Sequence, residues 1–161
     1  MAKRTLTVNL HITGARETIR AFGNLGKDAN NELRAASLTL SRTLAARIQL
    51  AARREGGAAG LLARTVKARR DRVPVVVAGG STRVGRHRTA AGRILFAAEF
   101  GANGRYGWYG RPRYRESDGR QFKPHSGQEG YWFFPTARAY QPEIDAEYND
   151  TVDDLLRRWA A

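Results

Sequence analysis

The sequence contains no cysteine, and this absence removes several kinds of site at once. Disulfide frameworks, zinc sites built on thiolates and cysteine nucleophiles are all excluded. The chain also has no apolar run approaching the roughly 20 residues of a membrane span. Its first residues, Met1 to Arg4, lead into an alternating pattern rather than the apolar core of a signal peptide. We therefore expect no membrane segment, and a core that forms without covalent or metal cross-links.

Acidic residues are scarce, since 15 Asp and Glu stand against 28 Lys and Arg, which gives a formal net charge of +13. The positive excess lies between residues 53 and 123, whereas residues 129–161 are net negative. Nearly all of the cations are arginine, which pairs with both phosphate and carboxylate groups. Three interpretations stay open: a nucleic-acid surface, contacts between oppositely charged neighbouring subunits, or arginines that are simply solvated.

Motifs for catalysis, cofactors and metals are also missing. The histidines His11, His87 and His125 are far apart in sequence, and none has the spacing of a metal site. No phosphate-binding loop follows a strand, and no nucleophile elbow accompanies Ser126 and Asp118, the polar neighbours of His125. We therefore expect a protein without catalytic residues, cofactor or bound metal.

The longest regular pattern runs from Asp28 to Arg54 and contains neither proline nor glycine. Its large apolar residues recur at helical spacing on one face: Leu33, Leu40, Leu44 and Ile48. The pattern predicts a helix about 40 Å long. Asp28 is the expected N-cap, and Gly56-Gly57 is the expected end.

The remaining segments predict a small sheet. Alternation over Thr5 to Thr13 indicates a strand with one buried face, and a short helix is expected from Arg16 to Phe22. Leu61 to Lys67 and Val73 to Ala78 are interpreted as an antiparallel pair. The period of Arg93 to Gly101 does not separate helix from strand.

The C-terminal part is aromatic and then amphipathic. The aromatic run Tyr131 to Phe134 belongs in a core or an interface. Pro142 suits the first turn of a final helix, whose apolar stripe is Ile144, Tyr148, Val152, Leu155 and Trp159. These elements predict one α+β domain over residues 1–161, with a small, mostly antiparallel sheet packed against one long helix and a C-terminal amphipathic helix.

A glycine-rich insert occupies about residues 102–130 and interleaves arginines with aromatic residues such as Trp108 and Tyr109. This composition suits bases stacking on rings while arginines contact phosphates, and it suits a protein interface equally well. With the basic segment before it, the insert supplies the possible DNA-facing residues: Arg64, Lys67, Arg69, Arg70, Arg72, Arg105, Arg111 and Arg113.

Glu99 is the one carboxylate amid apolar residues, and we expect it to pair with an arginine of the same or a neighbouring subunit. The exposed acids Asp153 and Asp154 of the final helix are expected to take part in contacts between subunits. The full set of candidate interface or core residues is Glu99, Phe100, Trp108, Tyr109, Trp132, Phe133, Phe134, Asp153 and Asp154.

Three short motifs follow one another between the long helix and the final helix. They are Gly60-Leu61-Leu62-Ala63-Arg64-Thr65-Val66, then Ala98-Glu99-Phe100-Gly101, and then Phe133-Phe134-Pro135-Thr136-Ala137-Arg138. In this order the features resemble the neck and tail-completion proteins of long-tailed bacteriophages, the gene-product-ten-like family of HK-type siphophages. The chain departs from that family in its long insert and in Gly101-Ala102, where family members often have Gly-Thr.

The resemblance implies a structural virion protein of the head-to-tail junction, assembled in the host cytoplasm. Such a protein forms a homo-oligomeric ring, six-fold in the family's setting, around the channel for genomic DNA. Its expected partners are the tail terminator, the head-to-tail stopper or connector, and the tail tube proteins. The alternatives are that the chain is itself the tail terminator, or that it is a basic nucleic-acid-binding protein.

Overall fold

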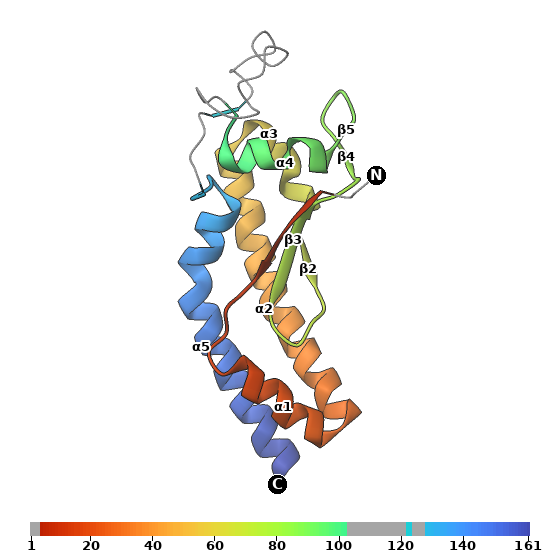
Figure 1. Ribbon diagram of the computed structural model, residues 1–161, viewed down its shortest axis with the longest axis vertical. Helices are drawn as coiled ribbons and strands as arrows, with labels where there is room; N and C mark the ends of the chain where they lie inside the picture. The colour runs from red at the N-terminus through yellow and green to blue at the C-terminus, as the bar shows by residue number, and fades with distance from the viewer. Residues whose placement is uncertain (1–3, 103–121, 124–127) are drawn as a thin grey trace.

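The computed structural model describes residues 4–102, 122–123 and 128–161. It has the α+β fold expected from the sequence, with two long helices that run along the longest axis of the molecule (Figure 1). These helices are α2 (Lys27–Glu55) and α5 (Phe133–Ala160), which run antiparallel to one another. A small three-stranded sheet packs beside α2, so the molecule has a helical side and a strand side.

The sheet has the order β1-β3-β2, and both pairs of strands are antiparallel. Its strands are β1 (Thr5–Asn9), β2 (Lys67–Arg69) and β3 (Val75–Gly79). Leu6 pairs with Ala78, and both are buried, so one face of the sheet enters the core. The predicted first strand ends earlier than Thr13, although Leu10 and Ile12 remain buried beyond the paired residues.

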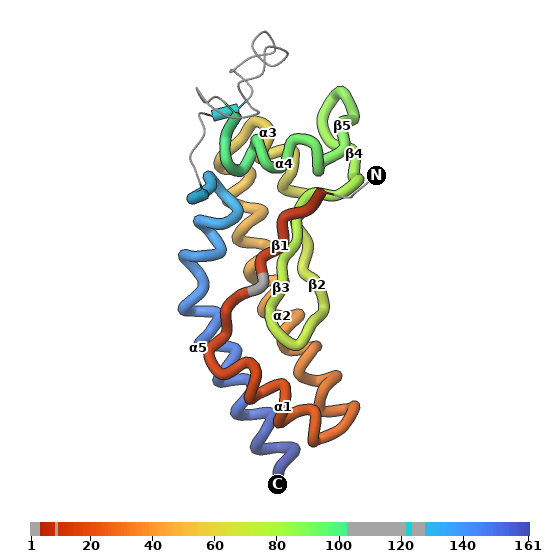
Figure 2. The backbone as a smooth tube through the Cα atoms, viewed as in Figure 1, coloured from red at the N-terminus to blue at the C-terminus, as the bar shows by residue number. Residues whose placement is uncertain are grey.

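The segment after β1 reaches α5 and turns there into α1 (Ala15–Leu25), as the tube in Figure 2 shows. The backbone nitrogen of Thr13 donates to Asp145 Oδ1 at 2.9 Å, and Gln141 Nε2 donates to the carbonyl oxygen of His11. These contacts tie the N-terminal part of the chain to the final helix.

The long helix α2 is confirmed, but its N-cap is Gly26 rather than Asp28. Gly26 has φ of 98°, a conformation that suits glycine, and it joins α1 to α2 in one residue. Asn30 Nδ2 donates to the carbonyl oxygens of Phe22 and Gly26, at 2.7 and 2.8 Å. The side chain that supports this helix start is therefore Asn30, and Asp28 lies in the first turn.

The interpretation of Leu61 to Lys67 as a strand is wrong over most of its length. Gly56, with φ of 73°, ends α2, and the chain forms α3 (Gly57–Leu62) and the 3₁₀ helix η1 (Ala63–Thr65) before β2. Ala59 and Leu62 are buried, so α3 packs one face against the core. The predicted antiparallel pairing survives as β2 with β3.

The undecided segment Arg93 to Gly101 is helical and belongs to α4 (Ala91–Phe100). Before it lies a short hairpin of β4 (Arg83–Val84) and β5 (Thr89–Ala90), in a stretch where the sequence showed no regular pattern. Ala91, Leu95 and Glu99 are fully buried on the inner side of α4.

The final helix begins at Phe133, nine residues before Pro142, so the predicted start is wrong. Pro142 lies inside the helix, where its missing N–H removes one hydrogen bond of the ladder. The predicted apolar stripe is confirmed, because Ile144, Tyr148, Val152 and Leu155 are all buried. Trp159 is half-buried, and its indole N–H donates to Glu32 Oε2.

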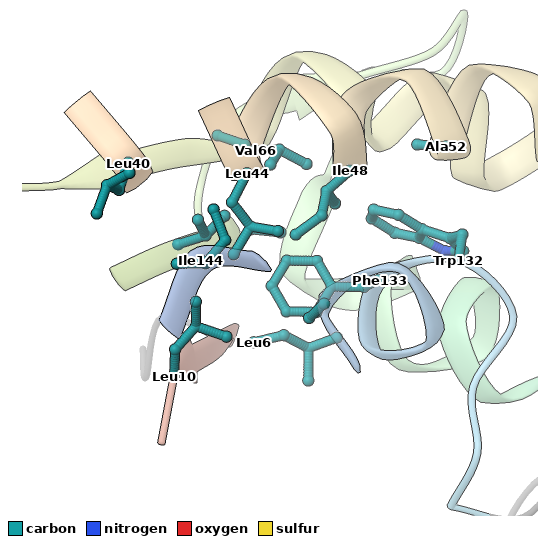
Figure 3. Close-up of a cluster of buried hydrophobic side chains, with 14 of the residues drawn as sticks. Leu6, Leu10, Leu40, Leu44, Ile48, Ala52, Val66, Trp132, Phe133 and Ile144 are labelled. Atoms are coloured by element: carbon teal, nitrogen blue, oxygen red, sulfur yellow. The ribbon is translucent and has the colours of Figure 1, made fainter. Parts of the chain in front are cut away.

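The core lies where α2, α5 and the sheet meet (Figure 3). Hydroxyl groups fix the turn between β2 and β3 to both helices. The carbonyl oxygen of Arg72 accepts from Ser37 Oγ at 2.9 Å and from the Tyr148 hydroxyl at 2.8 Å. The backbone nitrogen of Val75 donates to Ser41 Oγ at 2.9 Å. Burial raises the pKa of Tyr148 to about 12.

Candidate functional site

Glu99 lies in the last turn of α4 and is fully buried. Its Oε2 accepts from the backbone nitrogens of Trp132 at 3.2 Å and Phe133 at 2.8 Å, and its Oε1 accepts from that of Phe134 at 3.0 Å. The first N–H groups of a helix have no partner within the helix, and their dipoles favour negative charge. Glu99 therefore caps α5 from a distant part of the sequence.

The backbone around Glu99 is fitted closely to the carboxylate. The Glu99 carbonyl oxygen accepts from the nitrogen of Tyr131 at 2.8 Å, and the Ala98 carbonyl oxygen accepts from the Trp132 indole N–H at 3.2 Å. Gly130 has φ of 77°, and a Cβ atom built there would lie 1.9 Å from Glu99 Oε1. Only glycine fits at this position, so the path of the chain into α5 depends on Gly130.

Opposing effects act on the pKa of Glu99. Burial raises the pKa above the ordinary carboxyl value, while the N–H donors of Phe133, Phe134 and Trp132 lower it. The positive charge of Arg138 also lowers it, and the net direction is upward. Because both carboxyl oxygens are already engaged by the backbone, the geometry gives Glu99 a structural role rather than that of a general base.

The expected arginine partner of Glu99 is not found in the part of the chain that the structure describes. No ion pair within that part includes this carboxylate. Three backbone N–H groups take the place of a guanidinium, and these groups carry no signature in the sequence because they come from the main chain.

Aromatic rings surround this junction and join α4 to α5. The ring centroids of Phe100 and Phe134 are 5.9 Å apart, and those of Phe133 and Phe134 are 5.2 Å apart at 86°. Trp132 and Phe133 are buried, whereas Phe100 and Phe134 are half-buried. Four of the candidate interface or core residues therefore gather with Glu99 at one end of the molecule.

The insert leaves the described fold next to this junction. The backbone nitrogen of Ala102 donates to the carbonyl oxygen of Lys123 at 3.0 Å. The Lys123 ammonium pairs with Glu55 at the end of α2 and lies 5.1 Å from the ring centroid of Tyr131. Five candidates fall on the insert and lie outside the described residues: Arg105, Trp108, Tyr109, Arg111 and Arg113.

The other basic candidates lie on η1, β2 and the turn after β2. Arg64, Lys67, Arg69 and Arg70 are exposed, and Arg72 is half-buried. The β4–β5 hairpin adds further exposed arginines that the sequence reasoning did not single out, namely Arg83, Arg86 and Arg88. Arg64 donates to the Arg83 carbonyl oxygen, so the two basic segments are in contact. We call the exposed residues of these two segments the basic side.

Acidic side chains gather on the outer face of α5. Asp153 and Asp154 are exposed, as are Glu147 and Asp150 on the same helix, while Glu143 lies at the border of this face towards α2. We call this set the acidic side. In Figure 1, α5 lies on one side of the molecule and β2 with the β4–β5 hairpin on the other. The exposed acids of α5 therefore lie across the molecule from the exposed cations of β2 and the hairpin, although α5 also carries exposed Arg157 and Arg158 near its end.

Two ion pairs in the described part of the chain link α5 to α2, and the shorter one joins Glu143 to Arg47. Arg47 Nη2 lies 2.7 Å from Glu143 Oε1, and the Arg47 guanidinium lies 4.0 Å from the ring centroid of Tyr140. The hydrogen bond from Arg47 lowers the pKa of Glu143, and the same bond raises that of Arg47. The pair is exposed, so it specifies how the two helices align more than it adds stability.

Within the described ranges, no group of three or more His, Cys, Asp or Glu side chains is placed to hold a metal ion. No helix in that part of the chain has the length and apolar character needed to cross a membrane. In comparisons with protein-family models, with curated proteins and with solved structures, no match to the chain was found. We therefore infer function from the residues and their arrangement.

Proposed function

We propose that this chain is a structural subunit of the head-to-tail junction of a long-tailed bacteriophage, a neck or tail-completion protein. In this role it assembles as a ring around the DNA channel, beside the tail terminator. The observation that carries the proposal is the separation of charge, with the acidic side on α5 and the basic side on β2 and the β4–β5 hairpin.

Such a separation favours a head-to-tail contact between copies. A two-fold contact brings the same surface of both copies together, and like charges then oppose each other. A head-to-tail contact brings the acidic side of one copy near the basic side of the next, and a ring results when the rotation between copies closes. The charge pattern therefore suits a cyclic ring.

A second support comes from the motifs that carry the resemblance. Ala98-Glu99-Phe100-Gly101 and Phe133-Phe134-Pro135 are far apart in sequence, yet Glu99 accepts hydrogen bonds from Phe133 and Phe134. Two motifs of the resemblance therefore form one structural unit, the capped start of α5. This contact gives a physical reason for the two motifs to occur together.

In the proposed assembly the ring is six-fold, sits in the virion and lets genomic DNA pass through it. Its neighbours are the tail terminator, the head-to-tail stopper or connector, and the tail tube. A variant of the proposal makes the chain itself the tail terminator. Electron microscopy of particles that carry a labelled chain separates the two, because the terminator lies on the end of the tail tube.

Charge reversal tests the proposal. Changing both Asp153 and Asp154 to lysine is expected to weaken ring assembly and tail joining, most strongly at low salt, because the added charges face the basic side of the next copy. Glu17→Lys, an exposed reversal on α1, is the control. Equal assembly of both variants at every salt concentration contradicts the charge pairing.

A nucleic-acid-binding protein is the second candidate, and the basic side favours it. Lys67 and Arg69 are exposed on the edge strand β2, with Arg64 and Arg70 nearby in the chain. Phosphate contacts release counterions, so a DNA affinity that falls steeply with salt and is lost in a Lys67→Glu, Arg69→Glu variant supports this candidate.

Stacking by the insert has its own test in the same titration. Bases that stack on rings account for much of the affinity for single strands, at about 1–3 kcal/mol per base. Changing Trp108 and Tyr109 together to alanine is therefore expected to weaken binding to single-stranded DNA. Unchanged binding in that variant argues against stacking.

A further inference from the structure

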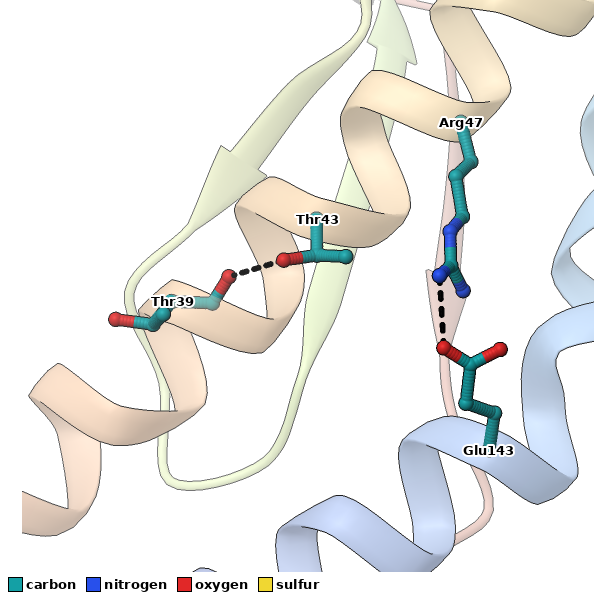
Figure 4. Close-up of polar contacts among 4 residues, drawn as sticks. All are labelled: Thr39, Thr43, Arg47 and Glu143. Atoms are coloured by element: carbon teal, nitrogen blue, oxygen red, sulfur yellow. Dashed lines mark hydrogen bonds and ion pairs between the residues drawn. The ribbon is translucent and has the colours of Figure 1, made fainter.

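The outward face of α2 differs from an ordinary solvated helix face. Figure 4 shows Thr39 and Thr43 on this helix, where the Thr43 hydroxyl donates to the Thr39 carbonyl oxygen at 3.2 Å. The Thr39 hydroxyl donates in the same way to Ala35 at 3.2 Å. Because both hydroxyls are satisfied within the helix, the outward face is less polar than its threonines suggest.

Larger residues on the same face add apolar area and positive charge. Leu50 is 45% exposed, and Ala46 lies one turn before it and is also exposed. Arg42 lies one further turn back, is exposed and makes no ion pair within the described part of the chain. A face that is apolar at its centre and charged at its border is typical of a protein interface.

The outward face of α5 has a matching sequence of residues. Pro142, Ala146 and Asp150 follow one another at intervals of four and are all exposed. Asp150 makes no ion pair among the residues that the structure describes. This face therefore offers an apolar residue, a small residue and a free carboxylate, in that order along the helix.

Contacts within the chain fix the relative height of the two helices. Arg47 of α2 pairs with Glu143 of α5 at 2.7 Å, and Glu32 pairs with Arg158 at 3.2 Å. Between these two pairs each helix advances by fifteen residues, in opposite directions. Leu50 is therefore level with Pro142, Ala46 with Ala146 and Arg42 with Asp150 to within about one helical turn.

We propose that the outward face of α2 docks onto the outward face of α5 in a neighbouring copy of this chain. Leu50 meets Pro142, Ala46 meets Ala146, and Arg42 pairs with Asp150. The inference rests on the proposed ring, adds that the long axis of each copy lies along the ring axis, and makes its contact more specific: the α5 face that carries Asp150 meets α2 of the next copy, with β2 packed beside that helix. Copies related by rotation about that axis keep residues at equal heights, so level residues of neighbouring copies come together.

The absence of cysteine makes a direct test available. Two singly substituted chains, Ala46→Cys and Ala146→Cys, are co-expressed, assembled and oxidised. A disulfide needs Cα atoms within about 7 Å. The proposal predicts disulfide-linked dimers in the mixture and none in either variant alone. The control replaces Ala146→Cys with Ser81→Cys, an exposed residue after β3 that is expected to give no dimers.

Charge exchange gives a second, independent measurement on the same contact. Arg42→Asp and Asp150→Arg are each expected to weaken self-association about two- to five-fold, the size of a rim ion pair. Combining the two changes in one chain is expected to restore association towards the original. Two single effects that add up without any rescue contradict the Arg42–Asp150 pair.

The outcomes separate this inference from the proposed function. Rings that form without the Ala46–Ala146 disulfide overturn the docking surface and leave the junction role in place. A chain that does not self-associate at all overturns both the docking surface and the ring. If Leu50→Asp weakens DNA binding while self-association is unchanged, the face is occupied by nucleic acid and the docking inference fails.

Discussion

The carboxylate of Glu99 accepts a hydrogen bond from the backbone nitrogen of Phe133, the first residue of α5, at 2.8 Å. The two residues are 34 positions apart in sequence and both are fully buried. A helix usually takes its cap from the residue before it, and Trp132 supplies none here. The position of the final helix therefore depends on a side chain of α4.

We predict that Glu99→Ala strongly destabilises the fold. It leaves the N–H groups of Trp132, Phe133 and Phe134 without their acceptor in a buried site, at a cost of about 3 kcal/mol or more. Glu99→Gln keeps the shape but turns an amide group towards an N–H donor, and is expected to cost about 1–3 kcal/mol.

Chemical denaturation of the Glu99 variants measures both effects on the free energy of unfolding. Glu17→Gln, at an exposed position in the first turn of α1, is the matched control and is expected to change stability by less than about 1 kcal/mol. Equal stability of Glu99→Ala and the original chain contradicts the capping role.

Two glycines give opposite predictions for the same substitution. Gly130→Ala places a Cβ atom against Glu99 Oε1 and demands φ of 77°, so a loss of more than about 2 kcal/mol is expected. Gly23 lies within α1 with nothing near its Cβ position. Gly23→Ala should therefore stabilise by about 0.5–1 kcal/mol. Thermal unfolding of both variants checks the contrast in sign.

The buried hydroxyl of Tyr148 predicts a loss of stability at high pH. Its pKa is raised from the ordinary value near 10 to about 12 in the folded state. Because the folded state resists ionisation, the stabilisation is complete below pH about 10 and is lost as pH rises to about 12, by about 2–3 kcal/mol.

Tyr148→Phe isolates this effect. The variant loses the hydrogen bond to the Arg72 carbonyl oxygen, at a cost of about 1 kcal/mol near neutral pH. The free energy of unfolding of the variant should lack the decline with pH that Tyr148 causes. The difference in stability between the two proteins therefore shrinks and then reverses above pH 10. A difference that is constant from pH 9 to 12 counts against the raised pKa.

Ser41 links α2 to the sheet, so its substitution is expected to lower the stability of the fold. Ser41 Oγ accepts from the Val75 nitrogen and donates to the Ser37 carbonyl oxygen at 2.8 Å. Ser41→Ala leaves the Val75 N–H unpaired in a buried site, so a loss of about 1–3 kcal/mol is expected. Thr43→Ala, an exposed change half a turn away, should cost less than about 0.5 kcal/mol.

Local patterns in the sequence are sufficient to predict an element whose structure depends on its own residues. The stripe Leu33 to Ile48 predicted α2, and the spacing from Ile144 to Leu155 predicted the buried face of α5, because helical periodicity is a property of the segment itself. The alternation in Thr5 to Thr13 predicted a buried face correctly, although only its first part pairs as a strand.

The errors arise where residues outside the segment decide its structure. From its neighbours alone, Pro142 indicates a helix start, but the cap from Glu99 lets the helix begin at Phe133. The pattern around Leu61 indicates a strand, but Gly56 changes the direction of the chain and a short helix packs against the core. Glu99 stands out in the sequence by its apolar surroundings, whereas its main-chain partners have no signal there and the expected arginine pair is absent from the described residues.

The measurement that tests the proposed function most directly is electron microscopy of phage particles that carry a labelled form of this chain. A label placed at the C-terminus, at the opposite end of α5 from Phe133, avoids the junction around Glu99 (Figure 1). The proposal predicts a ring of label at the head-to-tail junction, around the DNA channel. Label that is absent from the particles, or spread over the capsid or the length of the tail, contradicts it.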